Sequence, residues 1–403
     1  MRVFLLAGEP SGDRLGAAAM RGLRELRPGV ALDGIGGEAM EAEGLSSRFP
    51  MSDLTVMGLA EVLPRYRHLR RRLDETVAAV LETQPDVLLT IDSPDFGLRV
   101  AKAVKRAGAP VRCVHYVAPT IWAWRPGRAK KIRGVADQLL ALFPFEPPLW
   151  EAHGVPCDFV GHPVVADPVA TEAEARAFRA TLGIGEAPLV LALPGSRRSE
   201  VERLSGRFGE ALERVVRARP GARVVLPAAA PVADLVRDLA ASWPVRPVIL
   251  NPRGDPLAQA TKRAAFRAAD VALAASGTVS LELAASGTPM VIAYDMAWLS
   301  WQVISRMVRL DTVTLVNIVS GTRAVPEFLG PAFRPGPVAD ALLAVLDAPG
   351  AQAEAMRLTM ERLGQCGEPP GLRAARAILS RWEAAQAARA IQPPPSTRLP
   401  SGA

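Results

Sequence analysis

The chain has few of the residues on which several classes of protein depend. Its three cysteines form no CxxC pair and no framework that could be paired, which is typical of a protein from a reducing cytoplasm. Aromatic residues make up 5% of the sequence, and neither a zinc-finger spacing nor an RNA-binding aromatic signature occurs, so nucleic acid is not an expected partner. No window of 18 or more apolar residues lacks a charge, and the apolar run 3–7 is too short for a signal peptide.

Nucleotide-cofactor fingerprints are missing as well. The first glycine-rich stretch, GEPSGD at residues 8–13, is neither a GxGxxG motif nor a Walker A loop, which argues against nicotinamide and ATP. The sequence contains no DxD motif. It therefore predicts an activity without a cofactor and without a metal ion.

The composition that is present is that of a basic globular protein. At 403 residues, 49% of them apolar and 22% charged, two α/β domains are expected. The net charge of +7 predicts an anionic partner, such as a membrane surface or a phosphorylated substrate.

Short apolar runs alternate with amphipathic stretches in both halves of the chain. This alternation predicts parallel sheets with right-handed crossovers, with ligands beyond the carboxyl ends of the strands. We expect one domain over residues 1–165 and a second over 166–350, with the Pro/Ser-rich segment 391–403 as a disordered tail. The predicted strands cover residues 2–7, 30–34, 87–91, 111–117, 138–142, 189–193, 224–227, 248–250, 270–274 and 290–294.

In the first half, the strongest candidate is Asp92, which ends the strand in LLTIDSPDFG. A carboxylate at the edge of a sheet, backed by apolar residues, is suited to act as a general base. The alternative is a solvated aspartate that caps a helix. In the turn GEPSGD, Glu9 and Ser11 could bind an anion or a sugar, or the glycines could merely permit tight entry into a helix from about Leu15, with Asp13 near its cap.

The segment HYVAPTIWAWRPGR carries two tryptophans two residues apart in a Pro-flanked loop. Trp122, Trp124 and Arg125 could form a wall for an anionic, partly apolar ligand. His115 lies within the preceding strand, and we expect it to be mainly structural.

In the second half, the turn Gly195-Ser196-Arg197 after a strand is the best phosphate site in the sequence. The glycine allows close approach of a ligand, the arginine offers a planar fork, and a helix follows, for which we expect a capping box of Ser199 with Glu202.

A second turn offers further ligands for a nucleotide. The turn Ser276-Gly277-Thr278 precedes a short helix that we expect to begin at Val279 with Thr278 as its cap and to end at Gly287. Glu282 could accept hydrogen bonds from two ribose hydroxyls, or could simply be an acid in the first helical turn.

A Trp-rich segment, MAWLSWQVISRMVRL, has apolar residues at helical spacing. Trp298 and Trp301 could belong to an interfacial helix that contacts a membrane, or to an ordinary core helix.

Several motifs occur in series from about Val3 to about Leu379, and together they closely resemble the lipid-A-disaccharide synthases. They are GEPSGD, MGLAEVLP, IDSPDF, HYVAPTIWAW, FPFE, FVGHP, LPGSR, ASGTVSLE and the late Val316-Asn317. The resemblance implies two Rossmann-like domains that face a cleft, the GT-B arrangement, with C-terminal helices at about 351–390 completing the first domain. It also implies transfer of 2,3-diacylglucosamine from UDP to 2,3-diacylglucosamine 1-phosphate (lipid X), with inversion.

The resemblance also implies roles for single residues. Asp92 matches the base, Arg197 the diphosphate contact, Glu282 and Asn317 the nucleotide site, and Glu9 with Ser11 the cleft-facing first turn. It implies a cytoplasmic enzyme, peripheral on the inner face of the inner membrane, and is compatible with a homodimer. Another UDP-sugar transferase or epimerase, and a non-catalytic membrane protein that binds nucleotide sugars, remain as alternatives.

Overall fold

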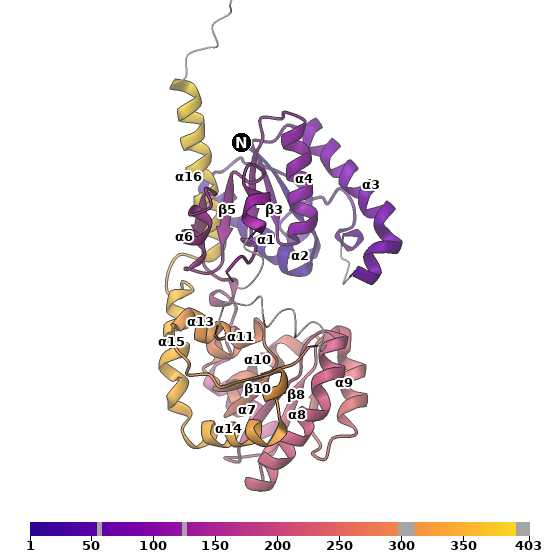
Figure 1. Ribbon diagram of the computed structural model, residues 1–403, viewed down its shortest axis with the longest axis vertical. Helices are drawn as coiled ribbons and strands as arrows, with labels where there is room; N and C mark the ends of the chain where they lie inside the picture. Colours follow the sequence, from indigo (N-terminus) through magenta and orange to yellow (C-terminus); the bar gives the residue numbers. More distant parts are fainter. Residues whose placement is uncertain (55–58, 123–126, 297–310, 392–403) are drawn as a thin grey trace, which may run out of the picture. The chain divides into compact units, whose positions relative to one another are not determined.

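The computed structural model describes residues 1–54, 59–122, 127–296 and 311–391 of the chain. They form two units, each a parallel β-sheet with helices packed on both faces (Figure 1). The first unit comprises Met1–Ile121, Pro126–Pro163 and Glu368–Ala403, and the second comprises Trp122–Arg125 and Val164–Gly367. The predicted fold class, α/β with two Rossmann-like sheets, is confirmed.

The sheet of the first unit has the order β2-β1-β3-β4-β5-β6, and all neighbouring strands are parallel. Its central strands are buried on both faces, which explains their continuous apolar sequences. The strands are β1 (Arg2–Ala7), β2 (Ala31–Ile35), β3 (Val87–Ile91), β4 (Arg112–Tyr116), β5 (Gln138–Ala141) and β6 (Cys157–Phe159).

Alternate residues of β1 point into two different cores. Val3 and Leu5 pack with α1 and α16, whereas Phe4 and Leu6 pack with α3 and α4 on the other face. Smaller helices complete the unit. Its helices are α1 (Pro10–Leu26), α2 (Glu38–Ala42), α3 (Leu59–Thr83), α4 (Pro94–Arg106), α5 (Arg128–Ile132), α6 (Glu146–Glu151) and α16 (Pro370–Ile391).

The last helix, α16, packs directly against the first, α1, although the whole second unit separates them in sequence (Figure 1). The two backbones meet at a pair of glycines. A Cβ at Gly22 would lie 2.7 Å from the carbonyl oxygen of Gly371, and a Cβ at Gly371 would lie 2.5 Å from the carbonyl oxygen of Ala18. A side chain at either position would therefore push the helices apart.

The sheet of the second unit has the order β12-β11-β10-β7-β8-β9, again wholly parallel. Helices α8, α9 and α14 pack on one face, and α10 and α11 contact the other. The strands are β7 (Leu189–Leu193), β8 (Arg223–Pro227), β9 (Val248–Leu250), β10 (Val271–Ala274), β11 (Met290–Tyr294) and β12 (Glu327–Leu329). The helices are α7 (Glu172–Thr181), α8 (Arg198–Ala218), α9 (Ala233–Ala240), α10 (Ala258–Ala268), α11 (Val279–Ser286), α13 (Leu315–Ser320), α14 (Pro335–Asp347) and α15 (Ala353–Arg362).

The return of the chain to the first unit begins later than the expected position of about 351. Helix α15 belongs to the second unit, where it packs against α11 and α13. Just before α15, the buried Gln352 side chain accepts a hydrogen bond from the backbone nitrogen of Met290 (2.9 Å) and donates one to the carbonyl oxygen of Met290 (2.8 Å). These bonds fasten the segment to β11, so that only α16 returns.

Candidate active site

The strand order reverses direction at one place in each sheet. In the first unit this place lies between β1 and β3, and in the second it lies between β7 and β10. In open parallel sheets such reversals leave a crevice at the carboxyl ends of the two strands, where ligands bind. The turns that follow these four strands, at residues 8–9, 92–93, 194–197 and 275–278, contain or adjoin most of the residues predicted from sequence.

The turn after β1 is shorter than the sequence suggested. Helix α1 begins at Pro10 rather than near Leu15, because proline is tolerated at a first helical position. A Cβ at Gly12 would lie 3.0 Å from the carbonyl oxygen of Ile91, so the glycine lets α1 approach the end of β3. This approach sets the half-buried Ser11 beside Asp92.

Asp92 follows β3 in an unusual backbone conformation. Its φ is +53° and that of Ser93 is +38°, so two consecutive non-glycine residues occupy the left-handed region. The Asp92 carboxylate accepts a hydrogen bond from the Ser11 hydroxyl (Oγ–Oδ2, 2.7 Å) and another from the backbone nitrogen of Ser93 (3.0 Å). Strained backbone of this kind concentrates at functional sites, where the surrounding contacts hold it.

Glu9 joins the same cluster from the other strand. It is exposed and precedes α1, and its Oε1 accepts a hydrogen bond from the Ser93 hydroxyl (3.0 Å). The cluster formed by Glu9, Ser11, Asp92 and Ser93 thus presents two carboxylates and two hydroxyls at the carboxyl edge of the first sheet. We call it the carboxylate cluster.

Asp13, expected near the cap of its own helix, has another role. It is 5% exposed, and its carboxylate accepts hydrogen bonds from the backbone nitrogens of Gly37, Ala39 and Met40. It therefore caps α2 and holds the glycine-rich turn after β2 against α1.

The structure gives His115 a structural role and leaves the tryptophan loop partly undescribed. The buried ring of His115 makes a hydrogen bond with the Thr90 hydroxyl (2.8 Å), and burial lowers the pKa of the imidazole to about 4. Trp122 is half-buried, whereas Trp124 and Arg125 lie outside the described residues.

In the second unit, the turn after β7 is built around a glycine and an acid. Gly195 has φ +118°, a conformation that favours glycine. Helix α8 begins at Arg198, and Glu200 in its first turn accepts hydrogen bonds from the backbone nitrogens of Ser196 and Arg197 (3.3 Å each). The predicted capping box of Ser199 with Glu202 is wrong, because the helix starts early enough to make Glu200 the capping acid.

The turn after β10 leads into α11, which begins at Val279 as predicted and ends at Gly287, whose φ is +70°. Thr278 precedes the helix, but its side chain makes no capping hydrogen bond, because its backbone is already helical (φ −63°, ψ −20°). Glu282 is held by Lys262 of α10, whose Nζ lies 2.6 Å from Oε2. Ser276 is half-buried, and Gly277 is exposed.

Asn317 is 1% exposed, and its amide is used within the protein. Its Nδ2 donates to the carbonyl oxygen of Val325 (2.9 Å), and its Oδ1 accepts from the nitrogen of the same residue (3.0 Å). Glu327 Oε1 lies 3.2 Å from Nδ2 and also accepts from the backbone nitrogen of Thr314 (2.8 Å). The observed contacts of Asn317 therefore fix the segment from Thr312 to Glu327.

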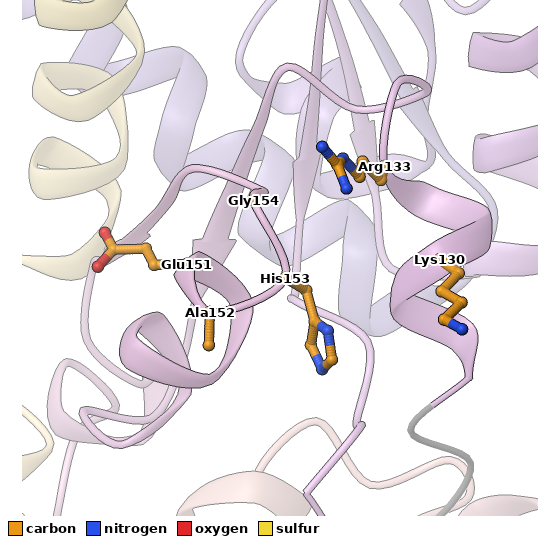
Figure 2. A pocket seen from close by; sticks show the side chains of 6 residues that line it. All are labelled: Lys130, Arg133, Glu151, Ala152, His153 and Gly154. Atoms are coloured by element: carbon orange, nitrogen blue, oxygen red, sulfur yellow. The ribbon is translucent and has the colours of Figure 1, made fainter.

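A separate pocket of about 430 Å³ lies on the surface of the first unit (Figure 2). Basic side chains dominate it, and the Glu151 carboxylate points away from His153 and Lys130. None of the site residues predicted from sequence lines this pocket. Arg133 precedes β5 and the turn 152–154 precedes β6, so neither follows the carboxyl end of a strand. Its lining residues are Lys130, Arg133, Glu151, Ala152, His153 and Gly154.

Among the helices that the structure describes, none has the length and apolar character needed to cross a bilayer. Within the described ranges, no group of three or more His, Cys, Asp or Glu side chains is arranged to hold a metal ion. Trp298 and Trp301 lie outside the described residues.

Sequence reasoning missed Ser93, Glu200 and Lys262, which contact predicted site residues. Ser93 lies within the motif IDSPDF and Glu200 follows LPGSR by three residues, and their position at the start of a helix after a buried strand is a signal that could have found them. Lys262 had no such signal, because its contact with Glu282 comes from the packing of α10 beside α11.

Solved structures with this fold include enzymes that act on UDP-sugars. A putative UDP-N-acetylglucosamine 2-epimerase from Listeria monocytogenes superimposes with a TM-score of 0.63 at 14% identity, over 96% of this chain and 97% of its own. The UDP-GlcNAc 2-epimerase of Neisseria meningitidis, solved with UDP-GlcNAc bound, gives 0.63 at 10% identity, over 95% and 100%. At such identities the likeness concerns the fold alone.

Sequence relatives are much closer. The lipid-A-disaccharide synthase of Ruegeria pomeroyi is 63% identical over 383 residues, 94% of this chain and 95% of the relative. That of Rhodospirillum centenum is 47% identical, over 94% of each chain. The family model for lipid-A-disaccharide synthetase matches residues 3–368, and the chain belongs to this family.

Proposed function

We propose that the protein is an inverting glycosyltransferase that joins UDP-2,3-diacylglucosamine to lipid X. The 6-hydroxyl oxygen of the acceptor attacks the anomeric carbon of the donor, and the bond from that carbon to the diphosphate breaks. UDP departs with the electron pair, and the hydroxyl proton passes to a base. The products are lipid A disaccharide 1-phosphate and UDP. Family membership is the observation that carries this proposal.

Asp92 is the proposed base. Its carboxylate lies at the carboxyl edge of the first sheet, and both of its oxygens are oriented, by the Ser11 hydroxyl and by the backbone nitrogen of Ser93. Orientation matters because a general base must lie within hydrogen-bond reach of the proton that it removes. We assign Glu9 and Ser11 to the same acceptor region, together with Trp122, Trp124 and Arg125.

The turn after β7 is the proposed seat of the donor diphosphate. Gly195 has no side chain, so the backbone of the turn can closely approach a phosphate group. The exposed Arg197 can form paired hydrogen bonds with phosphate oxygens, and α8 contributes the positive end of a 21-residue helix. Because UDP leaves as an anion, these donors lower the barrier by stabilising the charge that develops on the diphosphate. Ser196 belongs to the same seat.

The turn after β10 is the proposed site of the uridine. Ser276, Gly277 and Thr278 follow β10, which pairs with β7 at the strand-order reversal, where a nucleotide is expected. Oε1 of Glu282 has no hydrogen-bond partner among the described residues, so it can accept from a ribose hydroxyl while Lys262 holds Oε2. Asn317 shapes this region through the segment that its amide fixes.

The substrates imply a membrane partner. Both carry acyl chains and reside in a bilayer, so the enzyme must reach the anionic inner face of the inner membrane. We assign this contact to Trp298 and Trp301, in keeping with the net charge of +7. Flotation with anionic vesicles tests it, and a Trp298→Ala/Trp301→Ala variant that floats like the wild type contradicts it. A homodimer remains a prediction, which light scattering of the purified protein can check.

The reaction itself is tested by mass spectrometry of the product from the two diacylated substrates. We expect the disaccharide 1-phosphate, formed only when both substrates are present. A different UDP-sugar activity, suggested by the epimerases of similar fold, would instead turn over the sugar nucleotide without lipid X. That outcome would overturn the proposal.

A further inference from the structure

The proposed diphosphate seat is already filled by a side chain of the protein. Glu200 reaches back from the first turn of α8, so that its Oε2 lies 3.3 Å from the backbone nitrogens of both Ser196 and Arg197. Its Oε1 lies 2.7 Å from Nη1 of Arg197. A Cβ at Gly195 would lie only 2.7 Å from Oε2, so the carboxylate rests directly against the glycine backbone.

Contacts from a second element hold Glu200 in this place. The hydroxyl of Tyr294, at the end of β11, donates to Oε1 at 3.4 Å. Burial, with the neighbouring carboxylate, raises the pKa of Tyr294, so its hydroxyl remains a donor at neutral pH. The Glu200 side chain is 11% exposed, whereas that of its partner Arg197 is 70% exposed. The acid is thus the inner member of the pair.

A carboxylate and a phosphate compete for the same kind of donor. Each needs N–H groups and, where one is present, a guanidinium. The two backbone nitrogens and the Arg197 guanidinium cannot serve Glu200 and a ligand phosphate fully at once. A diphosphate brought against the seated carboxylate would also meet a like charge.

We propose that Glu200 is an internal competitor of the donor diphosphate. The Glu200 carboxylate must give up these hydrogen bonds before a UDP-sugar or UDP can bind. The inference rests on the proposed function, since it takes the turn after β7 to be the phosphate seat. Its consequence is that Glu200 weakens the binding of donor and product alike. The return of the carboxylate then promotes release of UDP after transfer.

The test is the affinity for UDP of a Glu200→Gln variant, measured by calorimetry without lipid. Glutamine keeps an oxygen for the backbone nitrogens but has no charge for Arg197. We expect the Kd for UDP to fall roughly two- to fivefold, the scale of one partly exposed charge pair. The KM for the donor should fall with it. The matched control is Glu202→Gln. It removes an acid of the same helix that pairs with Arg198 (3.0 Å), and it should leave the Kd for UDP unchanged.

Glu200→Ala provides a second variant, and thermal unfolding of both variants reports whether they fold. Alanine removes the cap together with the charge, so the midpoint should fall while the Kd for UDP still decreases. A folded Glu200 variant that binds UDP as weakly as the wild type, or more weakly, would show that Glu200 serves only to orient Arg197, and the inference would be wrong. A wild-type protein that does not bind UDP would instead refute the proposed function.

Discussion

Replacing Asp92 by Asn tests the proposed base with little change in shape. The amide cannot accept a proton at neutral pH, so kcat should fall about 10²–10⁴-fold, the usual contribution of general acid–base catalysis. This corresponds to roughly 3–5 kcal/mol of transition-state stabilisation. If Asp92 only anchored the hydroxyl of Ser11, one charge-assisted hydrogen bond would be weakened, at a cost of about 1.5–3 kcal/mol or less. A loss above roughly 200-fold, which exceeds about 3 kcal/mol, therefore favours catalysis.

The fold should tolerate this change, since the φ of Asp92 is +53° and asparagine is among the few residues that adopt the left-handed region readily. The free energy of unfolding, measured by urea titration, should fall by no more than about 1.5 kcal/mol, because the amide oxygen still accepts a hydrogen bond from the Ser11 hydroxyl. The matched control is Asp95→Asn, three residues on, where the carboxylate is 91% exposed and lies 3.9 Å from Nη2 of Arg128. This control should keep its activity.

The assay is the initial rate of disaccharide formation at varied donor concentration, followed by mass spectrometry. The Asp92→Asn variant should lose kcat while its donor KM changes less than about threefold, because the proposed diphosphate contacts belong to other residues. Turnover within tenfold of the wild type would remove Asp92 from the role of base. A similar loss in the Asp95→Asn control would show that the assay reports a disturbed loop.

Arg197→Ala should raise the donor KM about 10–100-fold by removing a charge-assisted contact of about 1.5–3 kcal/mol. Arg198 is equally exposed, and Arg198→Ala should leave the donor KM unchanged. Equal effects of the two substitutions in steady-state kinetics would argue against a specific diphosphate site at Arg197. Asp13→Ala should lower the free energy of unfolding by about 2–4 kcal/mol in urea titration, because three backbone nitrogens lose their acceptor, and an unchanged midpoint would contradict the capping role. Burial lowers the pKa of both His115 and His162 from 6.5 to about 4, so between these values the unfolded chain binds protons that the folded chain does not. Stability should therefore fall as the pH drops from 6.5 to 4, by up to roughly 3 kcal/mol for each histidine, and the slope should decrease in His115→Gln.

The sequence predicted an element closely where the residues of that element alone determine it. The strands Leu189–Leu193 and Met290–Tyr294 coincide with the predicted ranges, because short apolar runs between turn residues are typical of buried parallel strands. The end of α11 at Gly287 also follows from its own residues. Strand β12 was missed, since its three half-buried residues form a strand only by pairing with β11.

The site was less predictable, because its geometry depends on contacts between distant residues. Asp92 is proposed from its place after a strand, but its hydrogen bond with Ser11 joins residues 81 positions apart, which no local pattern predicts. The acid at the start of α8 was misassigned for a different reason. Both Glu200 and Glu202 suit a capping role, and only the exact turn at Gly195, with its positive φ, determines which of them meets the free nitrogens.

The contact between α16 and α1 has a consequence for synthesis of the chain. Ala374, Ala375 and Ile378 of α16 belong to the same hydrophobic cluster as β1 and α1, so part of that cluster stays uncovered until the ribosome has made more than 370 residues. At about 5–20 residues per second, the interval after residue 163 lasts roughly 10–40 s. The second unit emerges in full during this interval. The part of the protein that is made first is therefore the part that finishes folding last, and its exposed surface is open to chaperones meanwhile.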